Sequence, residues 1–220
     1  MDTYLFSQIG SYTIILAVII GVVRFKKILE TYRLFIYMII IGLAIEIISY
    51  ISIALDYSYI SRIATNFYVL FEYFLIFFLF KRWGVFTAYK SMFRIINIVI
   101  LFIWVADNFL INTITETNSF FRVCYSTVLV LLSNNHLSRV MSLVQRNIHK
   151  NADFIICVTF ILYFSSRAVF EVFYFIKAPF SNNFYLYIFL IFLSINILSN
   201  LLYAYAMLCL PTKQKFIQPY

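Results

Sequence analysis

Long apolar runs alternate with short polar segments along the whole chain. Each run holds about 20 mostly apolar residues, the length that lets an α-helix cross the hydrocarbon core of a bilayer. The run at 120–140 is the least uniform, because Ser133, Asn134, Asn135 and His136 make its second half polar. The pattern predicts seven transmembrane helices, over residues 5–23, 34–55, 63–80, 93–111, 120–140, 154–176 and 184–210.

The composition fits a chain that meets lipid over most of its surface. Hydrophobic residues make up 64% of it and charged residues only 12%, and the mean hydropathy is +0.92. A soluble domain carries about 25% charged residues. Residues 1–220 are therefore expected to form a single all-α transmembrane domain, a multi-pass seven-helix bundle. The N-terminus lacks the basic region and cleavage site of a signal peptide, so the first helix is expected to be retained.

Lysine and arginine are distributed unevenly between alternate loops. Thirteen of the 17 fall in one set of loops: Arg24, Lys26, Lys27, Arg33, Lys81, Arg82, Lys90, Arg94, Arg139, Arg146, Lys150, Lys213 and Lys215. The other set holds Arg62 and Lys177, with Arg122 at a helix start. Cytoplasmic loops carry the excess of basic residues. The pattern predicts that the N-terminus lies outside and the C-terminus in the cytoplasm.

The formal charge of +8 does not indicate a nucleic-acid partner, because the basic residues lie in short patches between apolar runs. The expected surroundings are the lipid bilayer. Cys124, Cys157 and Cys209 fall inside apolar runs without a CxxC pair, which is typical of packed thiols. His136 and His149 have no neighbouring ligand set, so no metal site is predicted. No catalytic motif or cofactor-binding loop occurs, so no catalytic residue and no cofactor is assigned.

Ionisable side chains inside the predicted spans are the clearest candidates for function. Glu46 and Glu72 lie near the middle of their helices, where a charge costs roughly 2.5 kcal/mol or more. Such groups usually face the interior of a bundle and act there. The helical period places Thr65, Tyr68 and Glu72 on one stripe. The candidate ligand-binding or proton-relay residues are Glu46, Asn66, Tyr68, Glu72, Asp107, Arg167, Glu171, Asn196 and Asn200.

Two interpretations of these charges remain open. In the first, Arg167 neutralises Glu72 or Glu46 within a satisfied structural network. In the second, a carboxylate without a partner forms a ligand or proton site. Four carboxylates (Glu46, Glu72, Asp107 and Glu171) face two arginines, Arg122 and Arg167. This excess of negative charge favours a cationic, zwitterionic or protonic ligand.

The polar set is compatible with three classes of function. The preferred one is a binding or sensory module for a small or lipid-like ligand, which signals through a cytoplasmic or membrane protein partner. The first alternative is a small transporter or proton-coupled carrier that uses Glu46 and Glu72. It is weakened because no proline interrupts a span and glycines are sparse, whereas many transporters bind at broken helices. The second alternative is an intramembrane lipid-modifying enzyme, although enzymatic activity is not favoured.

Several stretches resemble a known group of sequences. These are Glu46 in the second helix, Asn66–Glu72, Asp153–Cys157 followed by Leu162–Ser165, and Asn196–Tyr203. Together they resemble an uncharacterised family of small bacterial seven-helix integral membrane proteins. The resemblance implies a seven-helix bundle in a bacterial inner membrane. Relatives of that kind are likened to membrane sensor regions of signalling kinases, but this chain has no kinase domain. No reaction or substrate is implied.

Overall fold

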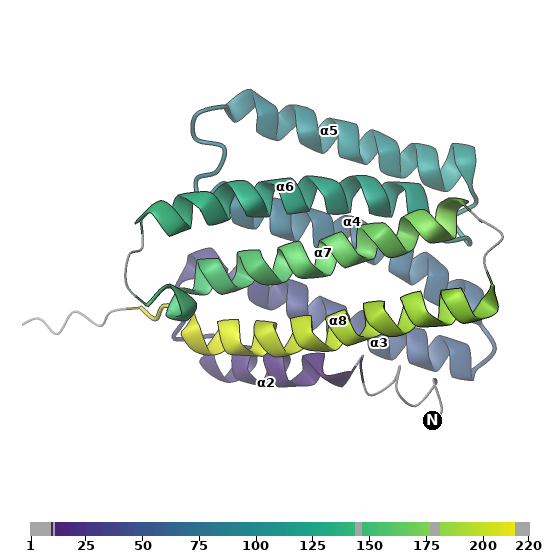
Figure 1. Cartoon of the computed structure of the whole chain (residues 1–220), viewed down its shortest axis with the longest axis horizontal. Coiled ribbons are helices and arrows are strands. Elements are labelled where there is room, and N and C mark those ends of the chain that lie inside the picture. The colour runs from purple at the N-terminus through teal and green to yellow at the C-terminus, as the bar shows by residue number, and fades with distance from the viewer. Residues whose placement is uncertain (1–9, 11, 144–146, 177–180, 214–220) are drawn as a thin grey trace, which may run out of the picture.

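The fold of residues 10, 12–143, 147–176 and 181–213 is described by a computed structural model and is almost wholly helical (Figure 1). Its α-helices are α2 (Ile14–Arg24), α3 (Arg33–Ala54), α4 (Ser58–Arg82), α5 (Lys90–Ala106), α6 (Ser119–Leu143), α7 (Ala152–Ile176) and α8 (Asn182–Cys209). Short 3₁₀ turns cover Glu30–Tyr32 and Ile148–Lys150, and a π-helical turn covers Asp107–Ile111. Among these residues there is no strand, only one isolated bridge between Ile28 and Thr212.

Each of the seven predicted helices coincides with one α-helix, so the all-α fold class is confirmed. Five helices are long and apolar enough to cross a membrane: α3, α4, α5 with its π-helical turn, α7 and α8. Helix α6 is as long as α4 and α7, but its second half is polar. Helix α2 has 11 residues in the described part. Residues 5–9 and 11 of the first predicted helix lie outside the described residues.

Helix ends follow from local backbone chemistry. Asp56 after α3 and Gly84 after α4 both have positive φ, 62° and 78°. In each case the next amide closes the helix with a bond to a carbonyl five residues back: Tyr57 to Ser52 at 2.8 Å and Val85 to Phe80 at 3.1 Å. This is the Schellman ending, in which a left-handed residue follows the helix. The helices therefore end sharply at short turns.

Consecutive helices alternate in direction (Figure 1). The most extensive packing joins α6 with α7, α3 with α4, α7 with α8, and α2 with α8. Helix α5 touches α4 and α6 only lightly and lies at one edge of the bundle. Asp107 and Asn108, directly after α5, are nevertheless buried. Helix α2 packs against both α3 and α8.

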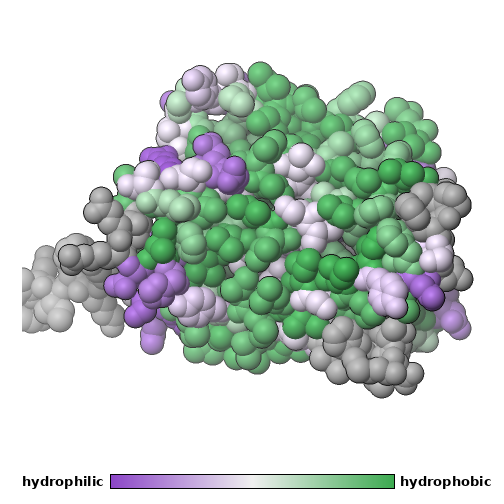
Figure 2. All heavy atoms as spheres, in the orientation of Figure 1, coloured by the Kyte–Doolittle hydropathy of each residue, from purple (hydrophilic) through white to green (hydrophobic). Residues whose placement is uncertain are grey.

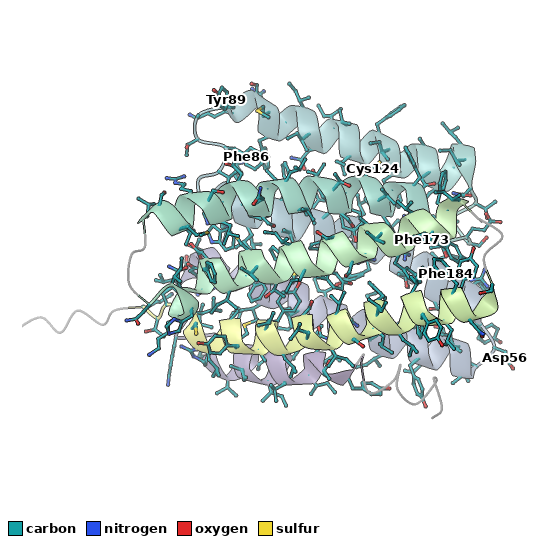
Figure 3. The ribbon with its side chains drawn as sticks, in the orientation of Figure 1. Asp56, Phe86, Tyr89, Cys124, Phe173 and Phe184 are labelled. Atoms are coloured by element: carbon teal, nitrogen blue, oxygen red, sulfur yellow. The ribbon has the colours of Figure 1, made fainter. Side chains whose placement is uncertain are left out.

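The alternation collects the basic loops at one end of the bundle, which we call the basic end. Its described residues are 25–32 between α2 and α3, 83–89 between α4 and α5, 147–151 before α7, and 210–213 after α8. Figure 3 shows Phe86 and Tyr89 near this end and Asp56, Phe173 and Phe184 near the other. Arg146, Lys177 and Lys215, which also entered the prediction of orientation, lie outside the described residues.

The sides of the bundle are apolar. Figure 2 shows hydrophobic residues across the middle of one face and hydrophilic residues mainly toward the two ends. Exposed large apolar side chains of the bundle include Phe102, Leu131 and Ile191. Continuous apolar surface of this extent is unusual on a soluble monomer. Together with the five apolar helices it fits a membrane protein.

Arg24 ties the first and last described helices together at the basic end. Its guanidinium donates to the carbonyl oxygens of Met207 and Leu208, and to that of Leu210 at 3.2 Å. These carbonyls lie at the C-terminus of α8, where no further turn supplies donors and a positive charge is favourable. The bond from the Lys213 amide to the Lys27 carbonyl, 2.8 Å, continues the same contact.

Between the middle of the bundle and the basic end lies a dense set of rings, which we call the aromatic layer. It comprises Phe35 of α3, Phe80 of α4, Phe160 and Phe164 of α7, and Tyr203 of α8. Phe160 lies 6.3 Å from Phe35, 6.2 Å from Phe80 and 6.0 Å from Tyr203, between ring centroids. Edge-to-face arrangements of this kind add stability beyond area burial. The layer closes the interior toward the basic end.

Candidate functional site

A polar cavity of about 240 Å³ lies in the middle of the bundle, above the aromatic layer. Helices α3, α4, α6, α7 and α8 all contribute polar side chains to it. Its polar lining comprises Glu46, Ser49, Thr65, Tyr68, Glu72, Arg122, Tyr163, Arg167, Glu171, Asn196, Asn200 and Tyr203. Tyr203 belongs to both the cavity and the aromatic layer. The cavity is thus built from residues scattered over most of the chain.

The Glu72 carboxylate accepts three hydrogen bonds in the cavity. Its Oε1 accepts from the Tyr68 hydroxyl at 3.0 Å, and its Oε2 accepts from the Tyr125 hydroxyl at 2.9 Å. Oε2 also accepts from Nη1 of Arg167 at 3.1 Å. Glu72 is 4% exposed. A charge at this depth is stabilised by an opposite charge and by hydrogen bonds together.

Arg167 is held by rings as well as by Glu72. Its guanidinium carbon lies 5.6 Å from the centroid of Tyr125 and 5.7 Å from that of Tyr163. Nη1 donates both to Glu72 and to the Tyr163 hydroxyl, 3.1 Å in each case. Among the described residues, no acceptor lies within bonding distance of its Nη2 or Nε. Arg167 therefore lines the cavity with N–H groups that make no hydrogen bond to a described residue.

A second ion pair joins α6 to α7 in the same cavity. Nη1 of Arg122 lies 3.1 Å from Oε1 of Glu171. The Nε of Arg122 donates to Asn118 at 2.9 Å, and its Nη2 to Asn66 at 3.4 Å. Oε2 of Glu171 accepts from no other described residue. Each guanidinium nitrogen of Arg122 thus donates one hydrogen bond, whereas only one of the two carboxylate oxygens of Glu171 accepts one.

Glu46 lines the cavity from α3 and is exposed, which distinguishes it from the buried Glu72 and Glu171. The cavity is therefore open to the surroundings of the bundle at this point. One turn earlier, Gly42 allows α3 to approach α4 closely. A Cβ atom there would lie 3.0 Å from the Tyr68 hydroxyl oxygen.

Seven of the nine candidate residues from the sequence line the cavity: Glu46, Tyr68, Glu72, Arg167, Glu171, Asn196 and Asn200. Helical periodicity explains the agreement, because Thr65, Tyr68 and Glu72 share one face of α4. In the same way Asn196 and Asn200 lie one turn apart on α8. Asn200 donates to the Thr13 hydroxyl at 3.0 Å, which also brings α2 to this region.

Asn66 does not line the cavity. Its side-chain nitrogen donates to the carbonyls of Ile114 and Glu116, at 2.9 and 2.7 Å. Its own carbonyl accepts from the Trp104 indole at 3.0 Å. Asn66 thereby fixes the loop between α5 and α6 over the end of α4 opposite the basic end. Its place in the molecule is that of a loop anchor.

Asp107 does not line the cavity either. It begins the π-helical turn that ends α5, and its Oδ2 accepts from the Phe121 amide at 2.8 Å. Its Oδ1 accepts from Asn112 at 2.8 Å. A carboxylate that accepts an amide of the first helical turn caps that helix and complements its dipole. Asp107 joins α5 to the start of α6.

Tyr125, Tyr163 and Arg122 are part of the site but were absent from the candidates chosen from the sequence. Tyr125 and Tyr163 bond directly to the pair of Glu72 and Arg167. The available signal was spacing, since Tyr125 follows Arg122 by three residues and Tyr163 precedes Arg167 by four. The chain has 18 tyrosines, many of them suited to membrane interfaces, so residue type alone did not single these out.

A separate polar cluster lies beyond the aromatic layer, near the basic end. His136 of α6 is buried and stacks on Trp83 with centroids 4.7 Å apart. Its Nε2 lies 3.6 Å from Oδ2 of Asp153, whose Oδ1 accepts from the Tyr32 hydroxyl at 2.5 Å. Within the described ranges, no group of three or more potential metal ligands lies together. The cluster joins the ends of α3, α4, α6 and α7.

Comparison with models of protein families, with curated proteins and with solved structures finds no match to this chain. The resemblance noted in the sequence therefore stays a prediction. Functional conclusions rest on the cavity itself.

Proposed function

We propose that this protein is a seven-span integral membrane protein whose central cavity binds a small or lipid-like ligand, as a binding or sensory module. The observation that carries the proposal is the incomplete pairing of buried charge. Arg167 and Glu171 both line the cavity and are each 6% exposed or less. Nη2 and Nε of Arg167 and Oε2 of Glu171 make no hydrogen bond to a described residue, whereas Nη1 of Arg167 and Oε1 of Glu171 do. Polar groups of this kind in the lining of a cavity suit a polar ligand.

The shape of the interior supports binding more than passage. The aromatic layer fills the bundle between the cavity and the basic end, and its rings are 5% exposed or less. A carrier in this conformation would have to open that layer. The side of the cavity at Glu46 is exposed, so a ligand has access without such a change.

The gathering of basic loops at one end supports the proposed orientation. Loops rich in Lys and Arg stay in the cytoplasm. The N-terminus would then lie outside a bacterial inner membrane and the C-terminus in the cytoplasm. The exposed basic end would contact a cytoplasmic or membrane protein partner that receives the signal.

Orientation is tested with single cysteines in a background lacking Cys124, Cys157 and Cys209. Asp56→Cys, in the turn between α3 and α4, and Tyr89→Cys, just before α5, lie near opposite ends (Figure 3). In intact cells a membrane-impermeant maleimide should label position 56 and not position 89. Labelling of position 89 alone would contradict the orientation.

Ligand binding is tested by calorimetry on the detergent-solubilised protein. The probes are ethanolamine, glycerophosphoethanolamine and lysophosphatidylethanolamine. Glu72→Gln combined with Arg167→Met removes the central ion pair without leaving a buried charge unpaired. It should weaken binding about 30-fold or more, because a buried charged contact contributes about 2–5 kcal/mol.

The matched control is Glu30→Gln with Arg33→Met, which removes an ion pair 3.2 Å apart at the basic end. It should bind every probe as the wild type does. Binding of no probe by the wild type, or equal binding by the Glu72 and Arg167 double variant, would contradict the proposal. Flux of a probe into proteoliposomes would instead indicate a carrier, and turnover of lysophosphatidylethanolamine would indicate an enzyme.

A further inference from the structure

An apolar groove of about 420 Å³ runs between α7 and α8 on the outside of the bundle. Its walls are mainly aliphatic: Ile161, Leu162, Val169, Ile188, Ile191 and Ile195. Val169 is 55% exposed and Ile191 60% exposed, so the groove is open along its length. At a rise of about 1.5 Å per residue, the wall from Ile161 to Val169 is roughly 12 Å long. On this apolar side of the molecule the groove would face lipid.

The groove and the polar cavity share a wall made of two rings. Phe170 of α7 and Phe192 of α8 line both spaces. The two rings stack, with centroids 4.9 Å apart and an interplanar angle of 19°. The two spaces therefore meet at this pair of rings.

Charged groups lie directly behind this pair of rings. Glu171 follows Phe170 in the chain, and Arg167 precedes Phe170 by three residues, so all three lie within about one turn of α7. Arg167 and Glu171 are the residues with polar atoms lacking a described partner. A molecule across the wall would place an apolar part in the groove and a polar part against these two groups.

We infer that the site takes a single-chain membrane amphiphile with a zwitterionic headgroup, admitted laterally between α7 and α8, with Phe170 and Phe192 as the gate. This inference rests on the proposed function and names its ligand class and route. The acyl chain would lie in the groove and the headgroup in the cavity.

The charges of the cavity select the headgroup. Three carboxylates (Glu46, Glu72 and Glu171) and two arginines (Arg122 and Arg167) line it. The excess of carboxylates would repel a purely anionic headgroup, and Arg167 would repel a purely cationic one. A phosphate matches the planar donors of Arg167, and an ammonium matches the open acceptor of Glu171. Phosphoethanolamine carries both groups.

The acyl chain raises the apparent affinity through local concentration more than through contact. Lipid tails are as apolar as leucine, so an acyl chain gains little free energy of contact when it leaves the bilayer or a detergent micelle for an apolar groove. The bilayer nevertheless concentrates chain-bearing molecules at the mouth of the groove. Water-soluble headgroups lack this advantage and would have to reach the cavity elsewhere.

Filling the groove tests the inference. Ile191→Trp places a large ring in the groove and leaves the polar cavity intact. Lysophosphatidylethanolamine should then bind about 10-fold more weakly, with binding of glycerophosphoethanolamine unchanged. Leu198→Trp is the matched control, because Leu198 is 48% exposed on the same helix and is not part of the groove lining. Val169→Trp, on the facing wall, is a second groove variant if Ile191→Trp does not fold.

The outcomes separate this inference from the proposed function. In the wild type, lysophosphatidylethanolamine should bind at least about 10-fold more tightly than glycerophosphoethanolamine. Equal binding of the two, or unaltered binding of lysophosphatidylethanolamine by both groove variants, would overturn lateral admission of an amphiphile and leave a water-borne ligand. Failure of the proposed function looks different: no probe binds, or the Glu72 and Arg167 double variant binds as the wild type does.

Discussion

The polar cavity and the aromatic layer are consecutive levels of the same bundle, yet their interiors differ. Helices α3, α4, α7 and α8 contribute to both. In the aromatic layer, Phe160 contacts both Phe35 and Phe80 edge to face. In the cavity, charged and hydroxyl groups bond in pairs around about 240 Å³ of open volume.

The difference lies in what each kind of side chain requires. Rings gain from close packing in any direction that brings edge to face. Buried charges need partners at fixed distances and angles, so their pairing constrains the separation of the helices that carry them. The bundle thus concentrates dispersion contacts toward the basic end and directional bonds in the middle. Of these two levels, it is the cavity whose described residues include charged groups with atoms that make no hydrogen bond.

Removing one member of the central ion pair should have the largest effect. Arg167→Met leaves Glu72 charged and buried, which should lower the free energy of unfolding by about 3–5 kcal/mol. Adding Glu72→Gln should restore most of the loss, because no buried charge then lacks a partner. Denaturant unfolding in detergent micelles measures both. If the double variant is as unstable as the single one, the pair does not act as a unit.

Truncating the centre of the aromatic layer should cost nearly as much. Phe160→Ala removes a ring that contacts Phe35, Phe80 and Tyr203, and should lower the free energy of unfolding by about 3 kcal/mol through the space left behind. No second substitution at the cavity level should rescue it. The control is Phe71→Ala, which removes a ring that is 59% exposed on α4 and should change stability by less than about 0.5 kcal/mol.

Adding a single methyl group should have a smaller effect, and one that differs between Gly42 beside the cavity and Gly21 in α2. Gly42→Ala places a carbon 3.0 Å from the Tyr68 hydroxyl oxygen and should disturb its bond to Glu72, at a cost of about 1–2 kcal/mol. At Gly21 the nearest atoms are 3.3 Å away, in the β-branched side chain of Ile36 and the flexible side chain of Met207. Gly21→Ala should therefore cost less than Gly42→Ala, because it disturbs no hydrogen bond and alanine favours helix. Equal losses at the two positions, measured by thermal unfolding, would contradict this contrast.

The smallest expected effect lies beyond the aromatic layer. Tyr32→Phe removes the hydroxyl that donates to Asp153 and should cost about 1 kcal/mol. Tyr37→Phe, on an exposed ring of α3, should change nothing measurable. Probe binding in the cavity should be unaltered in both variants. A change in binding on Tyr32→Phe would show that the cluster around Asp153 is coupled to the cavity.

Much of the cavity lining could be predicted, because the face of a helix on which a residue lies depends only on its position in the sequence. The spacing of Thr65, Tyr68 and Glu72 places them on one face whatever the rest of the chain does. Which charged groups pair with one another depends instead on contacts between helices. Arg167 faced Glu46 and Glu72 as equal alternatives in the sequence, and the packing of α4 against α6 and α7 selects Glu72. Glu171, which shares a stripe with Arg167, pairs instead with Arg122 from α6.

The structural roles of Asp107 and Asn66 could not be predicted from residue type. Both are polar residues in apolar runs, and both look like interior groups on that ground. The structure uses Asp107 to cap α6 and Asn66 to anchor the loop at 114–116. A cap and a ligand site have the same residue types, and only the neighbouring backbone separates them.

The sequence by itself determined the helical elements, the apolar sides of the bundle, the segregation of basic loops, and which stripe of each helix is polar. These properties depend on residue type and on the helical repeat. The tertiary structure alone decided which stripes meet, how the charges pair, and that rings close the interior toward the basic end. It also placed Phe170 and Phe192 between a polar cavity and an apolar groove. Such contacts join residues far apart in the chain, and their geometry arises only when helices pack.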